Sequence, residues 1–300
     1  MIKKSNFIIA SIFLFLATFF WAGNFIVGKV AGINEIPPIS LNIFRWSLAF
    51  LILLPFTYKE IIEKKDIILK NFFLLSILGI TAVSIFNSAL FYSLKSTQVI
   101  TGVLMISTVP VMIIFLSFIL KIEKANLFQI FGVIFSLVGV IFIISKAELS
   151  VLKNLNFERG DLFALFAMFS WSLYSALLRK KNYELSQITL LQVVIGFGVI
   201  FLIPCYAIDY IYIGNRISVD LNFILVLSYV VFLPGIVSFF FWIKGVSLIG
   251  VNSAGIFLHL TPILAAILAM IIFEEKLLFY HYIGGIFIIS GILLSNKKNA

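Results

Sequence analysis

The chain has 300 residues, of which 62% are hydrophobic and 12% are charged, and its mean hydropathy is +1.16. This much apolar surface exceeds what a soluble core can bury, which excludes a soluble globular protein and indicates a membrane protein. The net charge of +9 does not indicate a nucleic-acid partner, because the basic residues stand singly or in short groups between apolar runs.

Apolar runs of membrane-spanning length follow one another along the chain. Each span needs roughly 20 apolar residues, so about ten spans would use about two thirds of the chain. We predict ten transmembrane helices, at residues 7–27, 39–57, 71–92, 100–120, 127–145, 161–178, 189–208, 222–242, 253–273 and 279–295. The lysines before the first run are also typical of a secretory signal peptide, but the run has a counterpart in the second half, which favours a retained span. The one cysteine, Cys205, excludes an intrachain disulfide.

Residues 101–145 and 253–295 are two copies of one pattern. Each copy has an apolar span with a hydroxyl residue and a proline, a short break with Glu-Lys, and a second span with glycines seven residues apart. Five landmarks repeat at an offset of 152 positions: Pro110 and Pro262, Glu123 and Glu275, Lys124 and Lys276, Gly132 and Gly284, and Gly139 and Gly291. We therefore predict an internal duplication. The first repeat covers residues 1–145, an external linker 146–160, the second repeat 161–295, and a cytoplasmic tail 296–300.

The charges between the spans indicate that the two repeats are inverted. An odd number of spans per repeat makes the second repeat enter the membrane from the opposite side. Four lysines lie at 58–70, after the second span, whereas the connection after the seventh span has only Arg216 as a basic residue. Conversely, residues 179–181 are all basic, against the single Lys29 after the first span. By the positive-inside rule both termini are cytoplasmic. The predicted fold is therefore an all-α membrane protein of two inverted five-helix repeats, an arrangement typical of secondary transporters.

Three features resemble a known family over nearly the whole chain. They are WAGNFIVGK at 21–29, the Arg45-Trp46 step within PPISLNIFRWSLAF, and the proline span followed by Glu-Lys and a glycine-rich span in each copy. The sequence resembles the drug/metabolite transporter superfamily, specifically proteins with two EamA domains. The resemblance implies ten helices, a substrate path between the halves, and export or exchange of small metabolites, often amino acids. The chain departs from the family where the usual Gly-Glu break is Ile122-Glu123 and Glu274-Glu275, and where the second repeat lacks an arginine matching Arg45.

Pro110 and Pro262 are candidate substrate-site positions. Each removes a backbone donor in mid-span and frees the carbonyl four residues before it, at Ile106 and Leu258. Interrupted helices at matching places in both halves indicate a transport site. The alternative is a packed kink without a ligand.

Arg45 lies roughly six residues into the second span, about 9 Å deep at 1.5 Å per residue. An arginine inside a membrane usually faces a cavity or a partner, and its planar fork suits a substrate carboxylate. The alternatives are that it caps helix carbonyls or extends to the surface.

Three aromatic or amide pairs repeat at an offset of 150 positions and are candidate substrate-site residues. They are Trp21 and Trp171, Asn24 and Tyr174, and Tyr92 and Trp242. Aromatic walls with polar tips suit a small amphipathic substrate. The alternative for the tryptophans is an aromatic belt at the membrane interface.

His259, beside Pro262, is a candidate for proton exchange, with a buried neutral histidine bonded to a neighbouring helix as the alternative. Glu123 and Glu275 each precede a helix, and we expect them to cap it. The paired glycines, together with Gly285, predict close packing of the fifth and tenth spans at the rim.

The sequence contains no His-Glu-x-x-His motif, no phosphate-binding glycine loop and no metal-spaced cluster, and its spans have no central carboxylate. We therefore predict no catalytic residue, metal or cofactor. The partners are a small-molecule substrate and the lipid bilayer, without nucleic acid, and a homodimer through the rim helices is compatible but not required. The predicted function is a secondary transporter, an exporter or exchanger of small polar metabolites such as amino acids, in the cytoplasmic membrane. The alternative is a membrane-embedded enzyme or sensor.

Overall fold

The computed structural model describes residues 4–93, 105–154, 159–181, 183–214, 216–274 and 276–297, and this part of the chain is helical without strands. Its elements are α1 (Lys4–Ile33), α2 (Pro38–Glu63), α3 (Lys65–Lys70), α4 (Phe72–Gly79), η1 (Ile80–Ile85), α5 (Phe86–Ser93), α7 (Val109–Ile119), α8 (Leu127–Ile144), α9 (Leu149–Lys153), α10 (Arg159–Lys180), α11 (Gln187–Ile208), η2 (Asp209–Ile213), α12 (Leu221–Val231), η3 (Phe232–Val237), α13 (Ser238–Ile249), α14 (Val251–Gly255), η4 (Ile256–Leu260), α15 (Thr261–Phe273) and α16 (Phe279–Ser295).

Eight helical runs in the described residues are long and apolar enough to cross a membrane. They correspond to the first, second, third, fifth, sixth, seventh, eighth and ninth predicted spans. The shorter apolar helices α7 and α16 lie where the fourth and tenth spans were expected. Part of the fourth span, residues 100–104, lies outside the described residues, so the count of ten stays a prediction.

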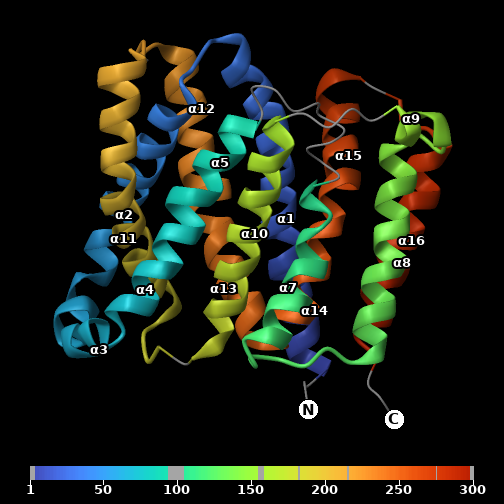
Figure 1. The fold of residues 1–300 in the computed structure, drawn as a ribbon, viewed down its shortest axis with the longest axis horizontal. Helices are drawn as coiled ribbons and strands as arrows, with labels where there is room; N and C mark the ends of the chain where they lie inside the picture. The colour runs from blue at the N-terminus through green and yellow to red at the C-terminus, as the bar shows by residue number, and fades with distance from the viewer. Residues whose placement is uncertain are drawn as a thin grey trace.

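Helices of one half pack mainly on helices of the other. Helix α1 packs on α13 and α15, and its counterpart α10 packs on α5 and α7 (Figure 1). The counterparts α2 and α11 pack together, as do α8 and α16. Exchanging the two halves therefore leaves the packing pattern unchanged, which indicates a pseudo-two-fold relation between them.

The glycines of α8 and α16 show the direction of this axis. A Cβ placed on Gly132 would lie 2.6 Å from the carbonyl oxygen of Gly291, and a Cβ on Gly139 would lie 2.5 Å from that of Gly284. Residue numbers rise along one helix as they fall along the other, so these counterpart helices are antiparallel. An axis along the membrane normal would make counterparts parallel, whereas an axis in the membrane plane makes them antiparallel. The close approach needs glycine, as predicted for the fifth and tenth spans.

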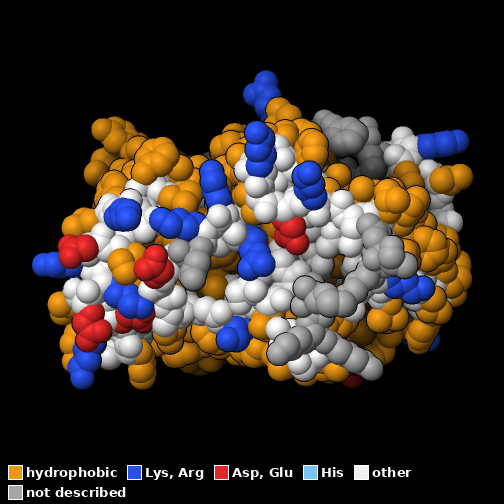
Figure 2. Space-filling view, turned by 90° about the horizontal axis from the view of Figure 1, so that it is seen from below, with side chains coloured by type: hydrophobic (Ala, Val, Ile, Leu, Met, Phe, Trp, Pro, Cys, Tyr) orange, Lys and Arg blue, Asp and Glu red, His pale blue; other side chains and the backbone are white. Residues whose placement is uncertain are grey.

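Both termini lie at the same end of the molecule, together with α3, and α9 in the linker lies at the opposite end (Figure 1). Lysine and arginine side chains gather on the end with the termini, which we call the basic face (Figure 2). Its exposed basic residues include Lys65, Lys70, Lys121, Lys124, Arg179, Lys180 and Lys181. This arrangement agrees with the charge pattern from which cytoplasmic termini were predicted.

Candidate functional site

Both predicted proline breaks interrupt a span. Pro110 lies in the first turn of α7, directly after a turn at residues 107–108. Pro262 lies in the first turn of α15, directly after the 3-10 segment η4. Proline is tolerated at a helix start because the first N–H groups lack intrahelical partners. Each proline therefore begins a new helical segment inside the span, and the two breaks occupy matching places in the two halves.

The two breaks contact each other through His259. Its Nε2 lies 3.0 Å from the carbonyl oxygen of Ser107, and its Nδ1 lies 2.6 Å from Oγ of Ser136 on α8. A carbonyl only accepts, so Nε2 carries a hydrogen, and in the neutral ring Ser136 donates to Nδ1. Ser107 is the counterpart of His259 at the 152-residue offset, so the pseudo-two-fold axis passes close to this contact. The geometry is that of a buried histidine bonded to neighbouring helices, and its role as a proton carrier stays a prediction.

All four tryptophans belong to one aromatic cluster between the halves. The counterparts Trp21 and Trp171 meet edge to face at 5.2 Å, and Trp242 lies within 5.8 Å of both. Phe239 contacts Trp21 and Trp171 at 5.9 and 5.2 Å and connects them to Trp46 at 4.9 Å. A belt tryptophan lies at the lipid surface, whereas Trp46, Trp171 and Trp242 are buried and Trp21 is half-buried. The belt alternative therefore does not describe these residues.

Polar atoms of the cluster lack partners. The indole Nε1 atoms of Trp46 and Trp242 and the hydroxyl of Tyr174 are buried without a hydrogen bond in the described structure. Tyr174 packs against Trp171 with ring centroids 5.2 Å apart. By contrast, Nε1 of Trp21 donates to the carbonyl of Pro234 at 3.0 Å. Buried polar groups are normally bonded, so three unpaired groups in one cluster make it a candidate ligand site.

Arg45 lies at the edge of this cluster. Its guanidinium stacks over Trp46 at 4.7 Å, and Nη1 donates to Oδ1 of Asn87 at 3.5 Å. Its Nε has no partner in the described structure. The side chain is only 5% exposed, so it does not extend to the surface, and its hydrogen bond in the described structure goes to a side-chain amide rather than to a helix carbonyl. Arg45 is thus a buried cation bonded to a neutral group.

Two π-helical segments flank Arg45. They are η1 and η3, which occur 152 residues apart and interrupt the third and eighth spans. Asn87 bonds the Ala82 carbonyl of η1 at 3.1 Å as well as Arg45, and Asn42 donates to the Val83 carbonyl at 3.3 Å. On the other side, a Cβ placed on Gly235 of η3 would lie 3.5 Å from Nε of Arg45. Such π segments are frequent at functional sites.

Sequence reasoning missed the surroundings of Arg45. Pro234-Gly235 inside an apolar span was a signal for an irregular helix, and Asn42 and Asn87 were polar residues within spans. Nothing in the sequence connects these positions with one another, because they lie on three different spans.

Two hydrogen bonds connect the aromatic cluster with the proline breaks. Thr18, one turn before Trp21, donates to the carbonyl of Phe257 in η4 at 3.4 Å. Ser172, next to Trp171, lies 3.5 Å from the carbonyl of Val109. The structure thus brings eight predicted site residues into adjoining positions: Trp21, Arg45, Pro110, Trp171, Tyr174, Trp242, His259 and Pro262. Asn24 is half-buried on α1 without a hydrogen bond in the described structure, and the side chain of Tyr92 lies outside the described residues.

Glu123 corrects one expectation. It does not cap the helix that follows it, because α8 is capped by Asn126 and Gln129 in a reciprocal capping box. Instead, Oε2 of Glu123 accepts from the backbone N–H of Val251 at 2.9 Å, at the start of α14. Burial raises the pKa of the Glu123 carboxyl, while the backbone N–H groups and the charge of Arg179 act in the opposite direction. The carboxylate therefore connects the first repeat with the broken span of the second. Glu275 lies outside the described residues.

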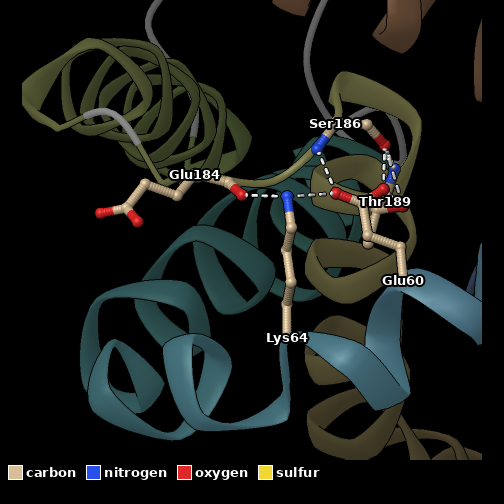
Figure 3. A network of polar contacts seen from close by, with 5 residues as sticks. All are labelled: Glu60, Lys64, Glu184, Ser186 and Thr189. Atoms are coloured by element: carbon tan, nitrogen blue, oxygen red, sulfur yellow. Dashed lines mark hydrogen bonds and ion pairs between the residues drawn. The ribbon is translucent and has the colours of Figure 1, made fainter.

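A second polar connection joins the halves at the basic face, and we call it the basic-face link (Figure 3). It consists of Glu60 and Lys64 at the end of α2, and Glu184, Ser186 and Thr189 at the start of α11. The Glu60 carboxylate accepts from the backbone N–H of Ser186 at 2.7 Å, and from the hydroxyls of Ser186 and Thr189 at 2.5 and 2.6 Å. Lys64 pairs with Glu60 at 3.0 Å and donates to the Glu184 carbonyl at 2.5 Å. These hydrogen bonds and the ion pair thus hold the counterpart helices α2 and α11 together at the basic face.

Comparison with known proteins gives one consistent result. The sequence matches the EamA-like transporter family over residues 8–145 and 158–297. It is 30% identical to an uncharacterized transporter of Clostridium kluyveri, over 96% of this chain and 94% of that protein. It is 27% identical to an uncharacterized transporter of Archaeoglobus fulgidus, over 95% and 96% of the two chains. A crystal structure with 17% sequence identity matches the fold with a TM-score of 0.74, covering 98% of this chain and 97% of its own.

Proposed function

We propose that this chain, which belongs to the EamA-like transporter family, is a secondary transporter of small polar metabolites that carry a carboxylate, amino acids among them. It moves them across the cytoplasmic membrane by export or exchange, with both termini in the cytoplasm. The basic face with both termini supports this orientation.

The observation that carries the proposal is the contact between the two helix breaks. His259 in the break of one half binds Ser107 in the break of the other, next to a cluster built from both halves. Irregular backbone at membrane depth is tolerated where it is enclosed by protein or lines a cavity. In transporters built from inverted repeats, the substrate site lies at such discontinuous helices between the repeats.

The two halves provide a direct route to alternating access. The basic-face link and the hydrogen bond from Val251 to Glu123 connect the two halves at the end of the molecule with the basic face. Rocking one half against the other would break these contacts and make the aromatic cluster accessible from the side of the basic face. Because the repeats are inverted, the opposite movement exposes the same cluster to the other side.

The test is transport by purified protein in proteoliposomes, with labelled amino acids and other carboxylates as substrates. Replacing Arg45 with Lys keeps the charge but loses the planar fork, so we expect uptake to fall about tenfold. Arg45→Ala should lower it further. Arg216→Ala, at the opposite end from the basic face, is the matched control and should transport normally.

Normal uptake of every tested carboxylate by well-folded Arg45→Ala protein would show that Arg45 is structural. Absence of uptake and of counterflow with every substrate by the wild-type protein would contradict transport itself.

A further inference from the structure

We propose that the site formed by Arg45 and the aromatic cluster selects a small organic monoanion in preference to a zwitterionic amino acid. Such a monoanion is a carboxylate without an ammonium group. The inference rests on the proposed function and narrows its substrate class. It follows from the charge at the site, from the hydrogen-bonding groups that the site leaves unpaired, and from the packing of its walls.

Arg45 gives the site a positive charge. Among the described residues, every Asp and Glu lies in a connection or near a helix end. In this part of the chain, the Arg45 guanidinium contacts Asn87 and Trp46 and no carboxylate. Burying a charge is energetically costly unless it is paired. A bound monoanion makes the site neutral, whereas a zwitterion brings a second positive charge into it.

The hydrogen-bonding groups that the site leaves unpaired are donors. Nε of Arg45 and Nε1 of Trp46 and Trp242 are buried and unpaired, and each of these atoms can only donate. The hydroxyl of Tyr174, also buried and unpaired, can donate as well. A ligand that satisfies these groups must present acceptors, which carboxylate, keto and hydroxyl oxygens do. An ammonium group has three donors and no acceptor, so it cannot bond to them.

Aromatic rings form the wall of the site. Aromatic faces attract cations, and an exposed face would therefore favour an ammonium group. In this cluster the rings cover one another: Trp21 meets Trp171 at an interplanar angle of 87° and Phe239 at 90°. Trp46 is already covered by the guanidinium of Arg45. The walls thus offer apolar contact for a hydrocarbon substituent, and the guanidinium offers its fork to the carboxylate.

The experiment uses full-length protein in detergent and its intrinsic tryptophan fluorescence. All four tryptophans belong to the cluster, so there is no background from distant indoles. The probes are monocarboxylates and 2-oxo acids of short to medium chain length, each titrated beside the amino acid and the amine of the same carbon skeleton. Thermal unfolding with the same probes is the second readout.

We expect monocarboxylates or 2-oxo acids of at least one skeleton to change the fluorescence and raise the unfolding temperature. The matching amino acid should bind at least about tenfold more weakly, and the amine should have no effect. Arg45→Lys should weaken carboxylate binding and Arg45→Gln should abolish it, while Arg216→Gln should bind like the wild type. If Arg45→Gln does not fold, the relative affinity of the wild-type protein for the acid and for the matching amino acid still tests the inference.

The inference is overturned if amino acids bind as tightly as the matching acids, if no carboxylate binds, or if Arg45→Lys and Arg45→Gln bind carboxylates normally. An amino-acid preference in uptake would refute the inference and leave transport standing. Carboxylate binding without any flux would instead refute the proposed function alone.

Discussion

At the residue scale, neighbouring glycines of α16 have different packing. A Cβ on Gly284 would lie 2.6 Å from the carbonyl oxygen of Gly139, a backbone atom that cannot move without shifting α8. A Cβ on Gly285 would meet Ile263 at 3.6 Å, which is an ordinary van der Waals distance. The repeat pattern identified Gly284 through its counterpart Gly132, but it assigned Gly285 to the same role. Only the tertiary structure distinguishes the two glycines, because backbone lies opposite Gly284 and a side chain lies opposite Gly285.

We therefore expect Gly284→Ala to destabilise the protein by about 1–3 kcal/mol, since the added methyl group forces two helices apart. Gly285→Ala is the matched control and should be close to neutral. Thermal unfolding in one detergent measures both. Equal effects of the two substitutions would contradict the close packing of α8 and α16.

At the scale of elements, the basic-face link holds α2 against α11 by charge-assisted hydrogen bonds. Glu60 accepts three bonds at the start of α11, whereas Glu63 on the next turn of the same helix is exposed. A bond to a charged group contributes about 1.5–3 kcal/mol, and several together fix the ends of two helices. If alternating access separates the halves at this face, these bonds must break in each cycle.

Glu60→Gln should weaken the link and expose the central cluster to the basic face for a larger fraction of the time. The measurement is the labelling rate of a cysteine at Ser172 by a water-soluble thiol reagent, in a Cys205→Ser background. We expect faster labelling with Glu60→Gln than with the control Glu63→Gln. The same rate for both variants would show that the link does not govern access.

At the scale of the whole molecule, the inverted halves and the basic face define a topology. The connection between α10 and α11 lies at the basic face, and the connection between α11 and α12 lies at the opposite end (Figure 1). Positive charge is retained on the cytoplasmic side during insertion, so the basic face is expected to be cytoplasmic.

Single cysteines at Lys181 and Arg216, each in a Cys205→Ser background, test this orientation. An impermeant thiol reagent added to intact cells should label Arg216→Cys, and label Lys181→Cys only after the cells are opened. Removal of Cys205 is needed because it is itself exposed. Labelling of Arg216→Cys from the inside alone would reverse the topology.

Much of the architecture could be predicted from the sequence because its signals are local or repeated. The apolar runs indicated the spans, and proline indicated the breaks because it removes a backbone donor wherever it stands. The 152-residue offset paired the two halves, and the opposite charge patterns of their connections indicated the inversion. Arg45, Trp21 and Trp171 were selected because a charge or a repeated aromatic residue within a span is uncommon.

The tertiary structure alone decided which residues meet. The expectation for Glu123 was wrong because Asn126 caps the helix that follows in sequence, and the Glu123 carboxylate instead accepts from the backbone at the start of α14. Asn87 and Gly235 lie beside Arg45 because π segments in two different halves converge there. His259 meets Ser107, 152 residues away, because the two helix breaks lie against each other between the halves. Such contacts depend on how many apolar segments of similar composition pack side by side, and no single segment carries that information.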